Sequence, residues 1–427
     1  MELKRGTPPP RIVIPESRHV IDTFPPMTRP ASQISAGDAA IYHPRVVDNP
    51  ADLERWRPYW ESVAWHPGTQ LDFFSLINKI RNDVLKPYVI VIERDNTPCA
   101  LVVGRLVKED FTCHIGYKRF NLGRVRQLNI LHGGILGCDD RACAQVVISA
   151  LDGVLRRREA DLVFINHLNI ASPLYGLARE YPGILCRDRA DMPQPHWKAA
   201  LPATSEAFLQ RLTQKHRYWL RRLERLAEAA YPGKVHCRFL AEGVPLDALM
   251  RDMEEVAAKT YQRQLGVGFR NDGEHVERFA LESGRGCLHV SVLYLGGKPA
   301  AFWVGTLYKG VFFSDYTGYN PEFRKYEPGT LLFMKMVEQL CLAGITEIDF
   351  GLGDAQYKQR FGDQNWMDAS VRIFAPTLKG ILLNVTQLSL QLPETCARSL
   401  LRHTRWLGYL KTLWRKRLVQ HAEGDRL

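Results

Sequence analysis

The sequence has no CxxC pair and no histidine cluster at the spacing that binds zinc. Its nine cysteines are scattered along the chain, at positions 99, 113, 138, 143, 186, 237, 287, 341 and 396. Closely spaced cysteines are the usual sign of a zinc module or of a small disulfide scaffold. We therefore expect reduced cysteines that are mostly buried as small apolar residues, and no metal cofactor.

Long apolar segments are also missing. No run approaches the roughly 18 to 20 uncharged apolar residues that a membrane-spanning helix needs. The N-terminal segment has prolines where a secretory signal would have its apolar core. These features predict a cytoplasmic protein that begins with a disordered leader over residues 1–38.

Acidic residues are scarce in two segments of a chain whose net charge is +11. Residues 376–427 hold nine Lys and Arg against three acids, and residues 205–230 hold six against three. Such clustering predicts anionic partners at two places or, for residues 205–230, only a solvated helix face. We expect no DNA partner.

The segment 398–417 has seven Lys and Arg and no acid. Apolar residues in and just after this segment recur at helical spacing and form a stripe, Leu400, Leu407, Leu410, Trp414 and Leu418. This pattern predicts a basic amphipathic helix. Such a helix would lie on an anionic membrane surface, at the inner face of the membrane, or on an acidic partner, or it would pack onto the protein's own core.

A hairpin pattern occurs twice, 201 residues apart. Residues 87–106, PYVIVIERDNTPCALVVGRL, align with residues 288–307, LHVSVLYLGGKPAAFWVGTL, and seven aligned positions are identical. Similar patterns follow in both copies. In the first copy they are a third strand near 111–118, a helix over 139–158 and a strand at 161–166. In the second copy they are a third strand at 311–316, a helix from Pro328 onward and a strand at 345–350. Each half is therefore expected to be a β-meander followed by a βα crossover.

This repeat predicts an α/β (α+β) fold with mixed sheets flanked by helices. The expected organisation is the leader, an N-terminal domain over residues 39–200, a C-terminal domain over residues 201–375 and a basic tail over residues 376–427. A bridging helix over residues 205–230 would connect the two domains. It would leave four basic residues in or near the groove between the halves, Lys215, Arg217, Arg221 and Arg222.

The helix that begins near Pro328 is a candidate site for a phosphorylated ligand. A helix N-terminus presents unpaired N–H groups and a partial positive charge. The entering loop adds two cations and a bare backbone, through Arg324, Lys325, Gly329 and Thr330. The first-half helix is preceded by Asp139 and Asp140, which repel a phosphate. A phosphorylated donor should therefore bind the second half, unless Pro328 and Gly329 form only an ordinary helix start.

Three segments of the second half resemble a known family: LYLGGKPAAFWVGTLYKG, YNPEFRKYEPGTLL and EIDFGLGDAQYKQRFG. Together they are similar to GNAT-superfamily acyltransferases of the cellulose-biosynthesis CelD/BcsL type. The likeness covers roughly residues 200–365 well and the first half more loosely. It implies two tandem GNAT-like domains with centrally splayed sheets, similar to the Fem aminoacyl transferases.

The resemblance also implies an acyl-CoA donor and an amine or hydroxyl acceptor that is a sugar or is related to polysaccharides. GNAT enzymes bind the CoA pyrophosphate with an Arg/Gln-x-x-Gly-x-Gly/Ala loop that opens a helix. Here Arg324 and Gly329 fit the first and last positions, whereas Glu327 replaces the middle glycine.

Many GNAT enzymes place their general acid in the loop after the strand that follows the donor helix. Acyl transfer from a thioester needs a neutral nucleophile and protonation of the departing thiolate. We expect Tyr357 to be the acid and Asp349 or Asp354 to be the base, and Lys358 to contact an anionic donor or acceptor. The structural alternatives are a cap for Asp354, a packed ring for Tyr357, a surface position for Lys358 and a buried ion pair for Asp349.

The acceptor is expected to face Asn166 and His167, at the end of the matching first-half strand, and Arg221 on the bridging helix. A structural role is the alternative for His167. No Gly-x-Ser-x-Gly elbow occurs, so a covalent acyl-enzyme is not expected.

Two other functions fit the same sequence features. One is a Fem-like transferase that uses aminoacyl-tRNA to modify cell-wall precursors, with the basic segments holding RNA. The other is a non-catalytic subunit of a polysaccharide-synthesis complex. Thioester-dependent turnover separates the enzymes from the subunit, and RNase sensitivity separates the two enzymes.

Overall fold

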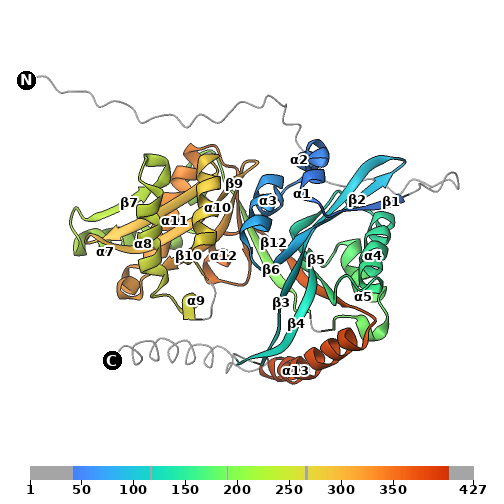
Figure 1. Cartoon of the computed structure of the whole chain (residues 1–427). Coiled ribbons are helices and arrows are strands. Elements are labelled where there is room, and N and C mark those ends of the chain that lie inside the picture. The colour runs from blue at the N-terminus through green and yellow to red at the C-terminus, as the bar shows by residue number, and fades with distance from the viewer. Residues whose placement is uncertain (1–41, 116–117, 190, 265–267, 403–427) are drawn as a thin grey trace, which may run out of the picture.

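The computed structural model describes residues 42–115, 118–189, 191–264 and 268–402 (Figure 1). Within these ranges twelve strands form one mixed sheet, in the spatial order β1-β2-β3-β4-β5-β12-β6-β11-β10-β9-β8-β7. This architecture confirms the expected α+β class with helices against a mixed sheet. The leader expected at residues 1–38 lies outside the described residues, as does most of the basic segment 398–417.

The first half, residues 42–200, contains two hairpins followed by a helical crossover to a parallel strand. Its strands are β1 (Tyr42–Val47), β2 (Val84–Arg94), β3 (Thr97–Ile115), β4 (Lys118–Leu136), β5 (Leu162–Asn169) and β6 (Gln194–Ala200). Its helices are α1 (Pro50–Leu53), α2 (Arg57–Val63), α3 (Leu71–Ile80), α4 (Arg141–Arg156) and α5 (Pro173–Glu180), with the short 3-10 helices η1 (Glu54–Trp56), η2 (Pro67–Thr69) and η3 (Ile184–Cys186).

The second half, residues 201–375, repeats this order. Its strands are β7 (Val235–Phe239), β8 (Leu288–Leu295), β9 (Lys298–Tyr308), β10 (Val311–Tyr319), β11 (Glu347–Leu352) and β12 (Gln364–Phe374). Its helices are α6 (Ser205–Gln210), α7 (Gln214–Ala230), η4 (Leu240–Glu242), α8 (Leu246–Ala257), α9 (Tyr261–Gln264), α10 (Gly273–Gly284), η5 (Pro321–Tyr326), α11 (Pro328–Leu342) and α12 (Gln356–Phe361). The last described helix, α13 (Leu378–Arg402), follows it.

The repeated hairpin has the same register in both halves. Val89 pairs with Val103 in the β2–β3 hairpin, and Val290 pairs with Val304 in the β8–β9 hairpin. The ladder also shifts at matching places, after Ile92 in one hairpin and after Leu293 in the other. The alignment at an offset of 201 residues therefore describes equivalent positions in space.

Two equivalent glycines allow the next strand to come close. A Cβ at Gly104 would lie 2.7 Å from Ile130 Cδ1 and 2.9 Å from Asn129 O. A Cβ at Gly305 would lie 2.1 Å from Phe313 O. Each hairpin can therefore pair with its third strand only because glycine stands at this position.

Strands β6 and β12 cross between the two halves. β6, the last strand of the first half, pairs antiparallel with β11 of the second half. β12, the last strand of the second half, pairs antiparallel with β5 of the first half. The two crossing strands also pair with each other. Each half is thus completed by a strand of the other, and both halves build the middle of the sheet.

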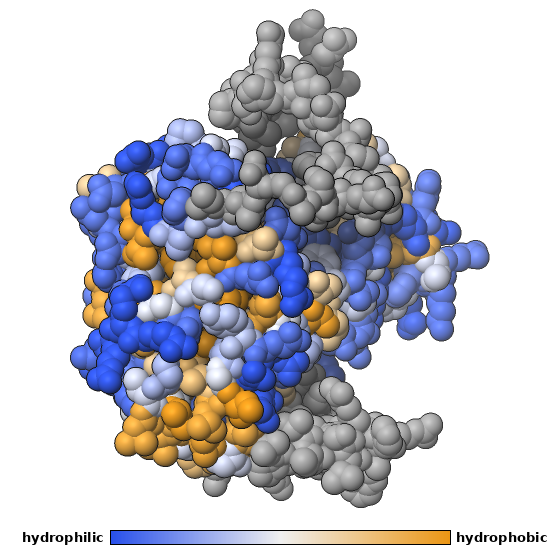
Figure 2. All heavy atoms as spheres, turned by 90° about the vertical axis from the view of Figure 1, so that its right-hand side faces the viewer, coloured by the Kyte–Doolittle hydropathy of each residue, from blue (hydrophilic) through white to orange (hydrophobic). Residues whose placement is uncertain are grey.

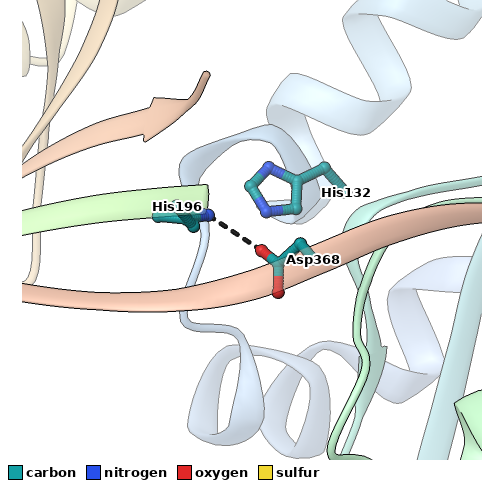
Figure 3. Close-up of side chains that lie close together, drawn as sticks. All are labelled: His132, His196 and Asp368. Carbon is teal, nitrogen blue, oxygen red and sulfur yellow. Dashed lines mark hydrogen bonds and ion pairs between the residues drawn. The ribbon is translucent and has the colours of Figure 1, made fainter. Parts of the chain in front are cut away.

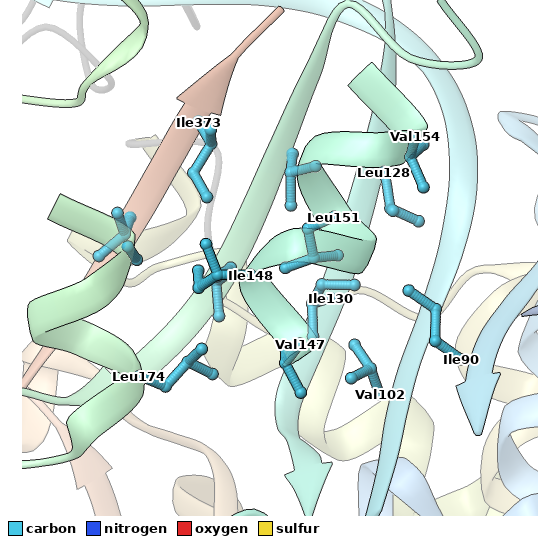
Figure 4. Close-up of a cluster of buried hydrophobic side chains, with 14 of the residues drawn as sticks. Ile90, Val102, Leu128, Ile130, Val147, Ile148, Leu151, Val154, Leu174 and Ile373 are labelled. Carbon is cyan, nitrogen blue, oxygen red and sulfur yellow. The ribbon is translucent and has the colours of Figure 1, made fainter. Parts of the chain in front are cut away.

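Helices cover both faces of the sheet, so alternate strand residues enter different cores. In the first half, Ile90 and Ile92 lie in the cluster beneath α4 and α5, whereas Val89 and Val91 lie in the cluster beneath α2 and α3. Figure 4 shows Val147 and Leu151 of α4 pointing at the strand side chains of the first cluster. In the second half, α7 and α11 cover one face, and α8 and α10 cover the other.

The halves also contact each other beside the sheet. Helix α3 packs against α10, and Asp72 on α3 forms an ion pair of 2.5 Å with Arg285, the C-cap of α10. Lys309 donates from Nζ to the carbonyl oxygen of Ala64 at 2.7 Å. These contacts all lie on the face that carries α3 and α10.

Three sequence expectations differ from the structure. The third first-half strand, expected near 111–118, is instead the end of β3, which continues to Ile115 and pairs with a 19-residue β4. The bridging helix expected over 205–230 is divided, because Thr213 caps a new helix by accepting a hydrogen bond from the His216 N–H. The basic tail expected from residue 376 begins as part of the body, since α13 buries Leu383 against β3.

The described start of α13 has one buried side and one exposed side. Asn384 donates to the carbonyl oxygens of Leu185 and Arg187, whereas Leu378 and Leu382 are 85% and 63% exposed. Figure 2 shows apolar residues gathered on the lower part of this face of the molecule, where α13 lies. None of the helices within the described ranges combines the length and the apolar character that a bilayer-spanning segment requires.

Candidate functional site

A buried histidine lies between two carboxylates in the middle of the sheet. Figure 3 shows it with one of them, Asp368. His196 stands on β6, which pairs with β11 on one side and with β12 on the other. Its Nε2 lies 2.7 Å from Asp349 Oδ1, and its Nδ1 lies 2.9 Å from Asp368 Oδ2. All three residues are at most 3% exposed. The crossing of β6 and β12 thus brings together side chains that are far apart in the sequence.

The surroundings favour a charged imidazole at His196. Ionised carboxylates only accept hydrogen bonds, so each ring nitrogen facing one should carry a proton. Burial by itself lowers the pKa of His196, but the hydrogen bonds to Asp349 and Asp368 outweigh burial and raise that pKa. Burial would raise the pKa of Asp349, yet the hydrogen bond to His196 and the nearby Lys198 hold it below its usual value. An imidazolium between two carboxylates is the arrangement that results.

Further groups balance the charge of this cluster. Lys198 Nζ lies 2.5 Å from Glu347 Oε1 and 3.7 Å from Asp349 Oδ2. The Trp366 ring stacks on the His196 ring at a centroid distance of 4.4 Å and an interplanar angle of 17°. A cation next to an indole face is attracted by the quadrupole of the ring, so Trp366 also favours the charged form of His196.

Three more histidines surround the cluster, and they are held neutral. The His132 ring lies 4.4 Å from that of His66, 4.8 Å from that of His167 and 5.7 Å from that of His196, between ring centroids. Burial lowers the pKa of His66 and of His167 to about 4, and it lowers the pKa of His132 well below the usual value. His66 Nδ1 accepts a hydrogen bond from the Gly68 N–H at 3.0 Å, which puts its proton on Nε2.

The backbone bends to bring these histidines together. β4 pairs with β3 through Ile130 and again from Ile135, and the residues between them bulge out of the ladder. His132 lies in this bulge beside Gly133, whose positive φ of 68° and close contact with His66 require glycine. His167 itself has a φ of 49° within β5. Trp65, which is 41% exposed, contacts the rings of both His66 and His132 and connects the cluster to the surface.

A second feature lies where β10 and β11 separate. These parallel strands pair only over three residues, Val311–Phe313 with Glu347–Asp349. Beyond them β10 continues beside β9, and β11 continues beside β6. β4 and β5 separate in the same way after Ile130 and Ile165. Both halves therefore have the splayed pair of parallel strands that was expected from the sequence.

The N-terminus of α11 lies at the edge where β10 and β11 separate, because α11 connects these two strands. A Cβ built at Gly329 would meet nothing within 4 Å, so the backbone of this first turn is accessible. Arg324 and Lys325 lie just before it in η5 and are exposed. These features fit the phosphates of a CoA-type donor.

Glu327 is the exception in this candidate phosphate site. It is the N-cap of α11 and adopts a left-handed conformation, with φ 46° and ψ 57°, in which glycine is preferred. Its carboxylate lies 3.9 Å from the Arg360 guanidinium. A negative side chain at this position opposes a phosphate.

The catalytic candidates of the loop after β11 separate in space. Ile348 and Phe350 face the core beneath α11, and the Tyr357 ring packs on Phe350 and Trp303 in the same layer. Asp349 points to the other face and bonds to His196. Asp354 is exposed and accepts a hydrogen bond from the Gln359 side chain.

Lys358 is buried rather than on the surface. Its Nζ donates to the carbonyl oxygens of Gly351 and Leu352, at 3.2 and 2.5 Å, so that it closes the loop after β11. Burial lowers its pKa to about 8.

The three expected acceptor contacts lie in two places. Asn166 accepts a hydrogen bond from Ser370 Oγ at 3.2 Å, and His167 belongs to the histidine cluster. Arg221 is exposed on α7, which packs against α11 and η5 within the second half. The described contacts of α7 thus put Arg221 on the side of the candidate phosphate site rather than beside Asn166.

Four residues of the cluster were not predicted from the sequence: His66, His132, His196 and Asp368. In the sequence Asp368 lies 172 residues after His196, and His132 lies 64 residues before His196. No local spacing connects such positions. The pairing of β6 with both β11 and β12 brings His196 to Asp349 and Asp368, and the bulge of β4 adds His132.

The sequence from residue 214 to residue 359 matches the model of the acetyltransferase (GNAT) domain. A search of curated protein sequences gave no match. The match supports the expected GNAT-type domain within the second half, whereas the CelD/BcsL type stays a prediction.

Several solved structures are similar to this chain at low sequence identity. FemX is 9% identical over 70% of this chain and 90% of its own, with a TM-score of 0.48. A tandem GNAT protein from the clavulanic acid biosynthesis pathway is 12% identical over 78% of this chain and 99% of its own, with a TM-score of 0.47. L-PGS from Bacillus licheniformis is 13% identical over 81% and 98%, with a TM-score of 0.44.

Proposed function

We propose that the second half, residues 201–375, transfers an acyl group from acyl-CoA to an amine or hydroxyl of a sugar or polysaccharide-related acceptor. The observation that carries this proposal is the separation of β10 from β11 beside the accessible N-terminus of α11. This feature lies inside the segment that matches the GNAT acetyltransferase domain. The corresponding helix N-terminus of the first half is less suited to a phosphate. There the carboxylate of Asp140 caps α4 and accepts a hydrogen bond from the Cys143 N–H at 2.7 Å.

In this proposal the first turn of α11 binds the donor phosphates. The N–H of Gly329 and the charges of Arg324 and Lys325 orient them, whereas the Thr330 N–H already donates to the carbonyl oxygen of Glu327 at 2.9 Å. The thioester is the activated acyl group that the donor supplies. Tyr357, in the loop after β11, is the proton donor for the departing thiolate.

The two candidate bases are not equivalent. Asp349 is already bonded to His196 and its pKa is lowered, so it is a weak proton acceptor. Asp354 is exposed at the start of the same loop and is the base we favour. In this proposal Asp349 holds His196 in place between the two halves and does not take the proton from the acceptor.

Two substitutions at the start of α11 test donor binding in opposite directions. Arg324→Ala should weaken CoA binding by about tenfold or more, since a charge-assisted hydrogen bond is worth roughly 1.5 to 3 kcal/mol. Glu327→Gly should tighten it about two- to fivefold, because it removes a negative charge at a helix N-terminus, worth roughly 0.3 to 1 kcal/mol. Calorimetric titration of CoA into the folded variants measures both.

The matched control is the pair of acids at the start of the first-half helix. Changing Asp139 and Asp140 to Asn should leave CoA binding nearly unchanged. If this change alters CoA affinity more than Arg324→Ala does, the donor site belongs to the first half and the proposal is wrong. Release of free CoA thiol from acetyl-CoA, measured over a panel of amino sugars and polysaccharide fragments, then tests turnover.

A further inference from the structure

We propose that His132, His196 and Asp368 bind a divalent transition-metal ion at the junction of the two halves. One ligand atom of each residue lies within 4.8 Å of the others (Figure 3). The ligands come from three different strands, β4, β6 and β12. This inference concerns the histidine cluster and does not depend on acyl transfer in the second half.

The distances suit an ion between these side chains. A metal bonds to histidine nitrogen and carboxylate oxygen at roughly 2.0 to 2.2 Å, so two neighbouring ligand atoms lie about 3 to 3.5 Å apart. His196 Nδ1 and Asp368 Oδ2 are already 2.9 Å apart. His132 lies in the β4 bulge and is only partly buried, and a shift of its ring would have to close the remaining gap.

Asp349 prepares His196 for this role. It accepts a hydrogen bond from His196 at Nε2, which leaves Nδ1 as the nitrogen that faces Asp368. Carboxylates commonly orient metal-binding histidines in this way, through the ring nitrogen that does not bind the metal. The ion would replace the proton on Nδ1, and that proton would pass to the solvent.

Asp368 has spare capacity as a ligand. Its Oδ1 atom is buried and has no hydrogen-bond partner among the described residues, although the residue is only 3% exposed. A buried carboxylate oxygen without a partner is unfavourable. An ion beside Asp368 would satisfy it.

Two imidazoles and one carboxylate suit zinc, iron, cobalt or manganese, and they leave coordination positions open. The rings of His66 and His167 lie 4.4 and 4.8 Å from that of His132, between ring centroids. Because the ligands join β4 to both crossing strands, the ion should stabilise the junction of the two halves.

The test uses the full chain after treatment with a chelator. We expect calorimetry to show one equivalent of Zn²⁺ binding. We expect Co²⁺ to give the visible absorption of a site with nitrogen ligands. His132→Gln and Asp368→Asn should each weaken binding at least 100-fold, and Asp349→Asn should weaken it 10- to 100-fold, as for other residues that orient ligands.

His43→Gln is the control, since His43 is an exposed histidine on β1. It should bind Zn²⁺ as the wild type does. The proposal is overturned if the folded wild type binds neither ion at micromolar concentration, or if the Co²⁺ spectrum shows only oxygen ligands. It is also overturned if His132→Gln and Asp368→Asn bind Zn²⁺ as tightly as the wild type. Should Asp368→Asn fail to fold, His132→Gln and the wild-type spectrum decide, because His132 is partly exposed.

Discussion

His196 is stabilised as a buried charge by the residues on its two neighbouring strands. Removing one partner of a buried ion pair costs roughly 3 to 5 kcal/mol, because the other charge is left unpaired. Here the partners are Asp349 and Asp368, and Trp366 covers the ring. Such a residue cannot be recognised from its neighbours in the sequence, since each partner lies more than 150 residues away.

Tyr357→Phe tests the proposed proton donor. If Tyr357 protonates the leaving thiolate, its loss should lower turnover by roughly tenfold to a thousandfold, with little change in donor affinity. The Phe ring keeps the packing on Trp303 and Phe350, so the fold should be unaffected.

Steady-state rates at saturating donor measure this effect. Tyr181→Phe, at a tyrosine that is 49% exposed, is the control for the loss of a hydroxyl and should retain full activity. Equal turnover by Tyr357→Phe and the wild type would leave the loop after β11 with a structural role only.

His289 gives a pH-dependent prediction for stability. It is 8% exposed on β8, its Nε2 is buried without a hydrogen-bond partner among the described residues, and burial lowers its pKa to about 4. Between pH 6.5 and 4 the unfolded chain therefore binds a proton here that the folded chain does not. This histidine makes the protein less stable as the pH falls through that window, by about 2 kcal/mol at pH 5.

The change His289→Leu should remove this dependence. At pH 7.5 the variant should be within about 1.5 kcal/mol of the wild type, because the two side chains have similar volumes. At pH 5 the free energy of unfolding of the variant, relative to that of the wild type, should be about 2 kcal/mol higher than it is at pH 7.5. Urea unfolding of both proteins at both pH values measures these free energies. If the variant differs from the wild type by the same amount at pH 5 and at pH 7.5, His289 titrates normally and the prediction is wrong.

At the scale of elements, the sequence predicts the repeated units well. The β2–β3 and β8–β9 hairpins, the helix over 139–158 and the helix from Pro328 all form, with ends that differ by a few residues. These elements have strong alternating or helical patterns, and their contacts are local. The equivalence of Gly104 and Gly305 was visible as an identity in the alignment.

The crossing strands were not predicted. β6 and β12 carry polar residues such as His196 and Asp368 where a buried strand would be apolar. Their partners are set by tertiary structure, because β6 pairs with a strand that follows it by about 150 residues. The long extension of β3 and β4 was missed for a related reason. The extension alternates apolar and polar residues, and its apolar side packs against α13, which is also distant in the sequence.

Gly305→Ala tests the close approach of β10 to β9. The added Cβ would lie 2.1 Å from Phe313 O and 2.6 Å from Phe312 Cε2, so the strands would have to move apart. We expect a loss of about 3 kcal/mol or more, at the upper end of what overpacking costs.

Denaturant unfolding measures this loss, and Gly176→Ala is the matched control. Gly176 lies inside α5 with nothing within 4 Å of a built Cβ, so alanine should be neutral or should stabilise by roughly 0.5 to 1 kcal/mol. If Gly305→Ala behaves like Gly176→Ala, the hairpin tolerates a side chain and the close approach is not required.

At the scale of the whole molecule, the exchange of β6 and β12 makes the halves interdependent. A chain cut between residues 203 and 204 would give one fragment whose β5 lacks β12 and another whose β11 lacks β6. An exposed strand edge without its partner promotes aggregation. We expect neither fragment to unfold cooperatively alone, and we expect the two to form a one-to-one complex when they are produced together.

Size-exclusion chromatography and thermal unfolding of the separate and combined fragments test this expectation. The contrary result would be a monomeric fragment 1–203 that unfolds cooperatively at the temperature of the intact chain. It would mean that the two domains proposed over residues 39–200 and 201–375 fold without exchanging strands.

The same exchange has a consequence during synthesis on the ribosome. β5 ends at Asn169, and its partner β12 begins at Gln364, nearly two hundred residues later. At about 5 to 20 residues per second, the nascent first half waits roughly 10 to 40 s with the edge of β5 unpaired. During that interval β6, which has already emerged, is the available strand beside β5, so an early pairing of these two would have to open again before β12 enters. A chaperone that binds nascent chains before residue 364 emerges should therefore raise the yield of the native protein.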